Sequence, residues 1–379
     1  MCPRPLPDWI ALNLLPGIGS VLVRRALERF GDPAEIAFCV PIEELSSLER
    51  FPRAAGPKIA DARGSLRRRA ERELERAARL GVRIISCEDA DYPSDFENLR
   101  DPPVVIYVKG QLPECRVRVA VVGSRVPTAY GRKVATGLAA GLAGREIQVV
   151  SGGARGIDAC AHEGALAAAG TTLAVLGSGL ARPYPPEHVE LFERIAASGS
   201  LVSEFALDEP PQRENFPRRN RLLAAFSAAV VVVEAGAKSG ALITAGHALE
   251  LGRDVLAVPG PVTSELSHGC HRLIQEGAKL VQQLDDVLDE LSPMYREALA
   301  RGSPAVPAEV PPDLDGLGGD EAVLLGLLDP VEPVQVDELA ERAPFGVARV
   351  QAALFGLELR RAVEQLPGRY YLSRPPKEP

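Results

Sequence analysis

Two apolar runs joined by a helical pattern constrain this chain more than any other feature. Both runs, Val117–Val122 and Ile147–Val150, are rich in β-branched residues, and the segment between them is typical of an α-helix. Such a strand-helix-strand unit belongs to a buried parallel sheet. The first strand ends at Gly123-Ser124-Arg125 and the second at Ser151–Gly156, which contains Arg155. Because ligands bind beyond the carboxyl ends of such strands, bare backbone beside an arginine at both ends predicts an anionic ligand, with phosphate as the first candidate.

Residues 79–295 continue this alternation of strands and helices. Further strands are expected at Val82–Ser86, Val104–Val108, Thr171–Leu176, Leu201–Ser203, Ala229–Val233, Val255–Val258 and Lys279–Val281. Helices are expected between them, notably at Ile157–Ala169, Glu187–Ala197, Arg218–Phe226 and Ala241–Leu251. The pattern predicts an α/β fold, an extended Rossmann-like doubly wound sheet over residues 79–295.

Residues 1–78 predict a separate helical domain. The turn Leu14–Gly19 separates two helical patterns, Asp8–Leu14 and Ser20–Phe30, and its Pro-Gly-x-Gly sequence leaves backbone N–H groups at the start of the second helix. The turn resembles a helix-hairpin-helix, a motif that holds nucleic-acid phosphates, although a plain helix–helix turn that packs against protein is favoured over DNA contact. Arg67-Arg68-Arg69 is interpreted as a solvated helix face with i,i+4 ion pairs.

The C-terminal region predicts a linker and a third domain. Residues 296–319 are rich in Pro and Gly and predict a linker. Residues 320–379 predict a winged helix, with helices at Glu321–Leu328, Val336–Arg342 and Gly346–Leu357 and a β pair around Val363–Leu366 and Tyr370–Leu372 that turns at Pro367-Gly368. Arg349 is the only basic residue of the third helix, so protein contact or simple packing is favoured over DNA reading by this domain.

Composition limits where a nucleic acid could bind. The 379 residues carry a net charge of −8, and only residues 1–80 have an excess of basic side chains. A nucleic-acid site must therefore be a local basic pocket. The longest apolar run, residues 222–233, is too short to span a bilayer, and the N-terminus has no apolar signal segment, so we expect a cytoplasmic protein without membrane contact. Six scattered cysteines without a C-x-x-C pair favour free thiols over disulfides.

Several strand ends combine small residues with cations. Phe216-Pro217-Arg218-Arg219-Asn220-Arg221 enters a helix with three arginines, although the helix dipole disfavours cations there. An anionic ligand would explain them, as would carboxylates such as Glu204 or Glu234. Gly236-Ala237-Lys238-Ser239-Gly240 follows another strand. One phosphate needs one such loop, so the repetition favours an oligonucleotide over a mononucleotide.

Other chemistries fit the sequence less well. The G-x-G-x-x-G fingerprint, the Walker pattern and the G-x-S-x-G elbow are all absent. His268-Gly269-Cys270-His271 lacks a second cluster of zinc ligands nearby in sequence. Asp158 and Glu163 could form a catalytic pair, but Asp158 is explained more simply as a cap or dipole partner at a helix start.

Ten ordered motifs resemble the DprA (Smf) family of DNA-processing proteins. They are AVVGSR (120–125), YG (130–131), SGGARGIDACAH (151–162), AVLGSGL (174–180), YPPEH (184–188), SE (203–204), FPRRNR (216–221), VVVEAGAKSGALITA (231–245), GRDVLAVPG (252–260) and LIQEGA (273–278). The motifs cover about 200 residues, and the predicted helical and winged-helix flanks fit the family as well.

The resemblance implies a non-enzymatic, homodimeric protein without cofactor or metal. Members of the family bind single-stranded DNA, with duplex DNA as a weaker ligand here, and load the RecA recombinase in homologous recombination during natural transformation, or in repair if the host takes up no DNA. Carried over by position, the DNA site is Gly123, Ser124, Arg125, Ser151, Gly152, Gly153, Ala154, Arg155, Gly156, Phe216, Arg219, Asn220, Arg221, Lys238, Ser239 and Gly240. Phe216 is expected either to stack on a base or to belong to the core.

Two alternatives stay open. The sheet and its turns also resemble lysine-decarboxylase-like nucleoside monophosphate hydrolases, but residues 236–250 lack the Pro-Gly-Gly start of their loop and retain only Glu250. The other alternative is a protein scaffold that binds RecA but no DNA.

Overall fold

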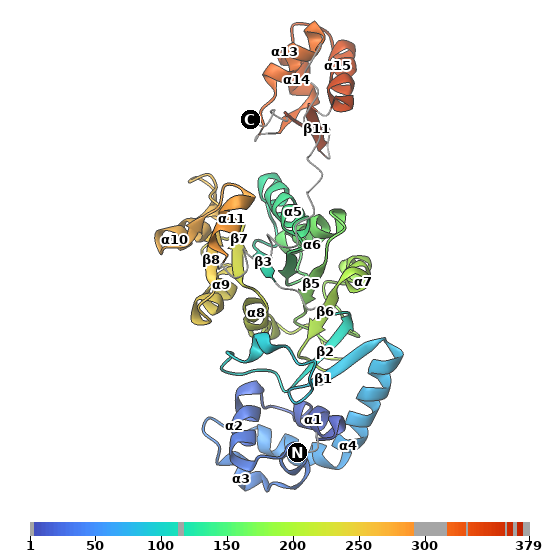
Figure 1. The fold of residues 1–379 in the computed structure, drawn as a ribbon, viewed down its shortest axis with the longest axis vertical. Helices are drawn as coiled ribbons and strands as arrows, with labels where there is room; N and C mark the ends of the chain where they lie inside the picture. The colour runs from blue at the N-terminus through green and yellow to red at the C-terminus, as the bar shows by residue number, and fades with distance from the viewer. Residues whose placement is uncertain are drawn as a thin grey trace. The chain divides into compact units, whose positions relative to one another are not determined.

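The apolar runs of residues 79–295 form one large sheet (Figure 1). Its strands are β1 (Val82–Ser86), β2 (Val105–Gly110), β3 (Arg118–Val122), β4 (Gln148–Ser151), β5 (Thr172–Val175), β6 (Ser200–Ser203), β7 (Ala229–Val232), β8 (Asp254–Ala257) and β9 (Lys279–Leu280). Their order is β1-β2-β6-β5-β4-β3-β7-β8-β9. Neighbours are parallel from β6 onward in this order, whereas β2 is antiparallel to both β1 and β6. The predicted doubly wound α/β fold is confirmed, with an antiparallel edge added.

The computed structural model describes residues 4–112, 117–291, 317–330, 333–360, 362–366 and 370–373. The chain divides into two compact units, residues 1–304 and 305–379. The helical region and the Rossmann-like sheet, expected as separate domains, both belong to the first unit. Most of the expected linker, residues 296–316, lies outside the described residues, so the linker stays a prediction.

The chain changes its direction of travel across the sheet at β3. After β3 it adds β4, β5 and β6 on one side, and then places β7, β8 and β9 on the other side. β3 therefore pairs with β4 through Val119 and Val149, and with β7 through Val121 and Val231. Such a reversal leaves a crevice beyond the carboxyl ends of the strands, where ligands of open α/β sheets bind. The topology thus points to the loops that follow β3 and β7.

Helices cover both faces of the sheet (Figure 1). One face carries α5 (Ala129–Ala143), α6 (Ile157–Ala167) and α7 (Val189–Ser198), and α11 (Leu284–Glu290) packs beside α5; the other face carries α8 (Asn215–Ala225), α9 (Ala241–Glu250) and α10 (His268–Gln275). Alternate residues of β3 serve the two faces: Val119 and Val121 pack with α5 and α6, whereas Ala120 and Val122 pack with α8 and α9. Full burial of each valine is worth about 1.5–3 kcal/mol, so the two cores hold β3 at the centre.

The N-terminal region is helical, as predicted. It contains α1 (Leu6–Asn13), α2 (Ser20–Phe30), the π-helical turn η1 (Glu35–Cys39), α3 (Ile42–Ser46) and the long α4 (Ala55–Arg79). Gly17 in the α1–α2 turn has a φ of +80°, which favours glycine. Arg67 does not form the expected i,i+4 pair but lies 3.7 Å from Asp8 on α1. Leu66 of α4 shares one hydrophobic cluster with Tyr107 of β2 and with Leu207 after β6, so this region packs directly on the sheet.

The second unit is a winged helix, as predicted. Its elements are α13 (Gly319–Leu327), β10 (Val334–Gln335), α14 (Val336–Arg342), α15 (Val347–Leu359), β11 (Val363–Leu366) and β12 (Tyr370–Ser373), and its sheet has the order β10-β12-β11. The expected turn at Pro367-Gly368 lies outside the described residues. Arg349, the basic residue of α15, makes a 2.6 Å ion pair with Asp320.

Candidate functional site

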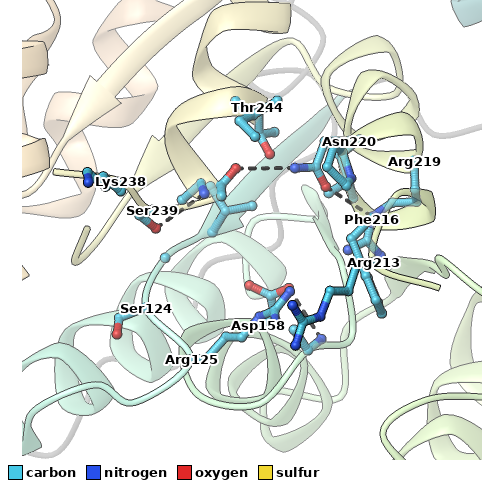
Figure 2. Close-up of a pocket in the computed structure, with 18 of the residues that line it drawn as sticks. Ser124, Arg125, Asp158, Arg213, Phe216, Arg219, Asn220, Lys238, Ser239 and Thr244 are labelled. Carbon is cyan, nitrogen blue, oxygen red and sulfur yellow. Dashed lines mark hydrogen bonds between the residues drawn. The ribbon is translucent and has the colours of Figure 1, made fainter. Parts of the chain in front are cut away.

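A cavity of about 990 Å³ lies at the point where the chain changes direction, beyond the ends of β3 and β7. Four cations and one carboxylate lie in its wall, Arg125, Arg213, Arg219, Lys238 and Asp158. The wall is therefore cationic in a chain whose net charge is −8. Figure 2 shows that these side chains come from several elements and surround one space. The lining residues are Val122, Gly123, Ser124, Arg125, Ala154, Asp158, Tyr184, Pro211, Arg213, Phe216, Pro217, Arg219, Asn220, Leu223, Gly236, Lys238, Ser239, Gly240, Ala241, Ile243 and Thr244.

The loop after β3 presents Arg125 to the cavity. A Cβ on Gly123 would lie 2.8 Å from Cγ1 of Ile157 and 2.9 Å from the carbonyl oxygen of Glu234, so only glycine lets the loop pass between these neighbours. The Ser124 carbonyl accepts a 3.0 Å hydrogen bond from the Ile157 N–H, which fastens the loop to the start of α6. Arg125 is exposed and makes no ion pair or hydrogen bond with any described residue. Its charge is thus available to a ligand.

The loop after β4 already holds an anion, the side chain of Asp158. Oδ2 of Asp158 accepts hydrogen bonds from the N–H groups of Gly152, at 3.1 Å, and Ala154, at 3.3 Å. Asp158 lies in the first turn of α6, as its interpretation as a dipole partner requires, but its side chain holds the preceding loop and does not cap the helix. Burial raises the pKa of Asp158, and Arg219 opposes this effect. Two N–H groups that the sequence offered to phosphate are therefore occupied.

The other predicted residues of this loop lie away from the cavity. Ser151, Gly152, Gly153 and Gly156 are not among its lining residues. Ser151 donates from Oγ to the Val121 carbonyl at 2.7 Å. Gly153 and Gly156 have φ values of +65° and +81°, so they serve the turn itself.

Arg155 is also outside the cavity lining. Its guanidinium is paired with Glu187 and donates a 3.1 Å hydrogen bond to the Tyr184 hydroxyl. It also lies 5.5 Å from the centre of the Tyr184 ring. Tyr184 itself lines the cavity, so Arg155 supports the wall through this tyrosine.

The arginines of α8 are used in different ways. Arg219 lines the cavity but is buried, and it donates to the carbonyls of Gly152, at 2.7 Å, and Val175. Burial lowers the pKa of Arg219 to about 10, against the opposing effect of Asp158. Arg221 does not reach the cavity and pairs with Glu204, one of the two carboxylates that the sequence offered. The other, Glu234, instead accepts a 2.9 Å hydrogen bond from the Thr128 N–H.

Aromatic side chains lie between the cations. The Phe216 ring is half-buried, and the guanidinium of Arg125 lies 5.3 Å from its centre. The centre of the Tyr184 ring lies 6.0 Å from the centre of the Phe216 ring. A planar group could stack against these partly open rings. Figure 2 shows Phe216 directed toward the space between Arg125 and Asn220.

The loop after β7 supplies the opposite wall. Lys238 is exposed and makes no ion pair or hydrogen bond with any described residue. The Ser239 Oγ accepts a 3.3 Å hydrogen bond from the Ala241 N–H, and the Asn220 side chain donates to the Gly240 carbonyl at 3.2 Å. These bonds fix the loop that carries Lys238 against α8.

Sequence reasoning missed several lining residues, of which Arg213 matters most. Arg213 is exposed and, like Lys238, has no ion pair or hydrogen bond within the described part of the chain. It lies in the proline-rich stretch just before Phe216, and a cation so close to the FPRRNR motif was the available signal. Thr244, also missed, is 1% exposed, and Figure 2 places it on the wall formed by α9.

The described residues contain no cluster of side chains that could bind a metal ion. No group of three or more His, Cys, Asp or Glu side chains there could hold a metal ion. In the sequence HGCH, the Cys270 thiol lies 3.6 Å from the Val232 carbonyl oxygen, and Nε2 of His271 lies 3.0 Å from the Gly260 carbonyl oxygen.

Among the helices that the structure describes, none is long and apolar enough to cross a membrane.

The fold and the site define a class of protein with a cationic cavity on a Rossmann-like sheet and a winged-helix domain. The family described as DNA recombination-mediator protein A matches residues 83–292, and the DprA winged helix domain matches residues 307–369. The chain belongs to the DprA/Smf family. Protein Smf of Synechocystis is 33% identical over 393 residues, which cover 97% of this chain and 98% of the relative.

Two solved structures agree with this assignment. DNA processing protein A of Streptococcus pneumoniae superposes with a TM-score of 0.66 at 33% identity, covering 76% of this chain and 99% of that one. DNA processing protein A of Helicobacter pylori, described for its single-stranded DNA binding mode, has a TM-score of 0.51 at 29% identity. That match covers 58% of this chain and 97% of the other.

Proposed function

We propose that this chain binds single-stranded DNA in the cavity beyond β3 and β7. The observation that carries the proposal is the group of three exposed cations that make no ion pair or hydrogen bond with any described residue: Arg125, Arg213 and Lys238. They come from three separate loops around one cavity, which suits a ligand with several phosphates. The single-stranded DNA binding mode described for the Helicobacter pylori protein supports the same ligand.

Each wall of the cavity has a role in this proposal. Arg125 and Lys238 contact phosphates across the cavity, with charge-assisted bonds worth roughly 1.5–3 kcal/mol each. Phe216 stacks on a base. Arg219 and Asn220 hold the loops around them and contribute polar edges to the wall. The backbone of the loops in the wall lies close to the ligand at Gly123, Ser124, Ala154, Ser239 and Gly240.

We further propose that the protein acts without catalysis, as a homodimer in the cytoplasm, and delivers the bound strand to the RecA recombinase in natural transformation or repair. The family description as a recombination mediator supports this role. In the nucleotide-hydrolase alternative, Glu250 is the residue of the hydrolase loop that the sequence retains. It is exposed, lies 3.2 Å from His247 and is not among the residues that line the cavity.

Fluorescence anisotropy of a labelled, mixed-sequence single strand tests the proposal. We expect binding that weakens steeply as salt rises, because phosphate contacts release counterions. A duplex of the same sequence is expected to bind more weakly. AMP incubated with the protein is the matched enzyme assay, and we expect no release of adenine. Release of base without binding of the strand would favour the hydrolase, and RecA binding without DNA binding would favour the scaffold.

A further inference from the structure

The cavity wall formed by residues 211–220 is preceded by residues bonded to the N-terminal helical region, and it is followed by Arg221, which is linked to that region through Asp101. This segment supplies Pro211, Arg213, Phe216, Pro217, Arg219 and Asn220 to the cavity. The first part of the segment belongs to the loop that connects β6 to α8, which is neither helix nor strand. The position of Arg213 and Phe216 therefore depends on what holds the residues before and after them.

Helix α4 holds the start of the segment. Oε1 of Glu73 accepts a 2.7 Å hydrogen bond from the N–H of Leu207, and Arg76, one turn further along α4, pairs with Asp208. Leu207 is fully buried in the cluster that the helical region shares with the sheet. The Leu207 carbonyl in turn accepts a 3.0 Å hydrogen bond from Ala181. Residues 207 and 208 are thus fixed by α4 on one side and by the loop after β5 on the other.

Helix α2 is linked to the end of the segment through Asp101, which lies between β1 and β2. The Ser20 hydroxyl donates a 2.8 Å hydrogen bond to Oδ2 of Asp101, and Nε of Arg221 lies 3.1 Å from the same oxygen. A Cβ on Gly19 would lie 3.6 Å from Nη2 of Arg218, so the α1–α2 turn also lies against α8. The helix-hairpin-helix-like turn, which the sequence suggested for DNA, therefore contacts α8, the helix that carries Arg219 of the cavity wall.

We propose that the N-terminal helical region positions the DNA cavity, with Glu73 and Arg76 as the positioning residues. By fixing Leu207 and Asp208 they limit the conformations of the following loop, and so keep Arg213 and Phe216 at the wall. Without these contacts, part of the binding free energy would be spent on ordering the loop. This inference rests on the proposed function, since it concerns the affinity of the same cavity for single-stranded DNA.

The helix offers matched controls. Glu75 and Arg72 lie on α4 close to the positioning residues, are exposed, and have no ion pair or hydrogen bond within the described residues. Glu73→Ala and Glu75→Ala remove the same charge from the same helix, as do Arg76→Ala and Arg72→Ala. Differences within each pair therefore report the contacts of Glu73, which include the Tyr107 side chain, and of Arg76, and not the charge. Glu73→Gln keeps an oxygen that can accept from Leu207 and serves as the conservative variant.

The experiment combines hydrogen exchange of the free, full-length protein with anisotropy of a labelled single strand. We expect Glu73→Ala and Arg76→Ala to speed exchange in residues 205–214 and to weaken binding by about three- to tenfold, with the slope of affinity against salt unchanged because no phosphate contact is lost. Glu73→Gln, Glu75→Ala and Arg72→Ala should keep wild-type exchange and affinity.

Faster exchange in residues 205–214 with unchanged affinity would overturn the inference, as would weaker binding without faster exchange. Equal weakening by the matched controls would also overturn it, because charge alone would then explain the effect. Failure of the wild-type protein to bind the strand would instead refute the proposed function, and the inference with it.

Discussion

The guanidinium of Arg221 and the carboxylate of Glu204 face each other in a two-pronged pair. Nη1 donates to Oε1 and Nη2 to Oε2, each at 2.8 Å, and the two side chains are 7% and 4% exposed. Burial by itself would lower the pKa of Arg221, but Glu204 and then Asp101 raise it above its usual value. This arginine therefore belongs to the core, although the sequence motif assigned it to the ligand.

Removal of Arg221 from its pair with Glu204 should destabilise the folded protein. We expect Arg221→Ala to lower the free energy of unfolding by about 3–5 kcal/mol, because the carboxylate of Glu204 would stay buried without its partner. Urea unfolding followed by circular dichroism measures this change. Arg218→Ala, at an exposed position of the same helix, is the control and should cost about 1 kcal/mol or less. An equal cost for both variants would contradict the structural role of the pair.

Substitutions at Phe216 distinguish the contribution of base stacking to DNA affinity from the contribution of charge. We expect Phe216→Leu to weaken binding of a single strand by about 1–3 kcal/mol, because base stacking is lost, while the salt dependence of affinity stays unchanged. Phe216→Trp should bind with near wild-type affinity, and its indole fluorescence should be quenched by the strand. The native Trp9 is 2% exposed in the N-terminal helices and provides a constant background. Unaltered affinity in Phe216→Leu would place this ring in the core only.

We expect the buried His162 to make the folded protein less stable against unfolding at acidic pH. Burial is the main cause that lowers the pKa of His162 to about 3, and His188 and Arg219 add to it. The Thr172 hydroxyl donates to the Val149 carbonyl at 2.7 Å and so accepts from Nδ1 of His162 at 2.7 Å, whereas the buried Nε2 has no hydrogen-bond partner. A proton on Nε2 would have no acceptor, so the folded protein keeps this imidazole neutral.

The sign of the effect follows from this pKa. A histidine in the unfolded chain takes up a proton below a pH of about 6.5, while the folded protein does so only near its lowered pKa, so stability falls as the pH drops through this window. Between about pH 6.5 and pH 4.5, wild type should lose about 2–3 kcal/mol more than His162→Gln, measured by urea unfolding. The difference between the two proteins at pH 8 serves as the baseline. Parallel pH profiles would show that His162 is not held neutral.

The strand-end turns show how far sequence reasoning reaches in this chain. Arg125 and Lys238 were predicted because strand direction and small residues alone place their loops at one edge of the sheet. Arg155 looked similar in sequence, but its partner Glu187 becomes a neighbour only in the folded chain; for Arg221 the sequence left a ligand and Glu204 both open, and the fold selects Glu204. Local spacing does not report such tertiary contacts.

Other features depended on contacts that no motif encodes. The N–H groups of Gly152 and Ala154 looked free until Asp158 was seen to accept from both. The antiparallel edge of the sheet was missed because an apolar run such as that of β2 carries no sign of its direction. The winged helix could be predicted from three short helices followed by a β pair, whereas the ion pair of Arg349 with Asp320 is a tertiary contact that the sequence did not indicate.

The salt dependence of single-strand binding tests the central claim most directly. Anisotropy titrations over a salt series should show that Arg125→Ala and Lys238→Ala each weaken binding and each reduce the slope of log affinity against log salt by about 0.7, with additive effects in the double variant. Arg194→Ala is the control, since this exposed arginine pairs with Glu163 and does not line the cavity. Unchanged slopes and affinities in both cavity variants would contradict the account and place the phosphates elsewhere on the protein.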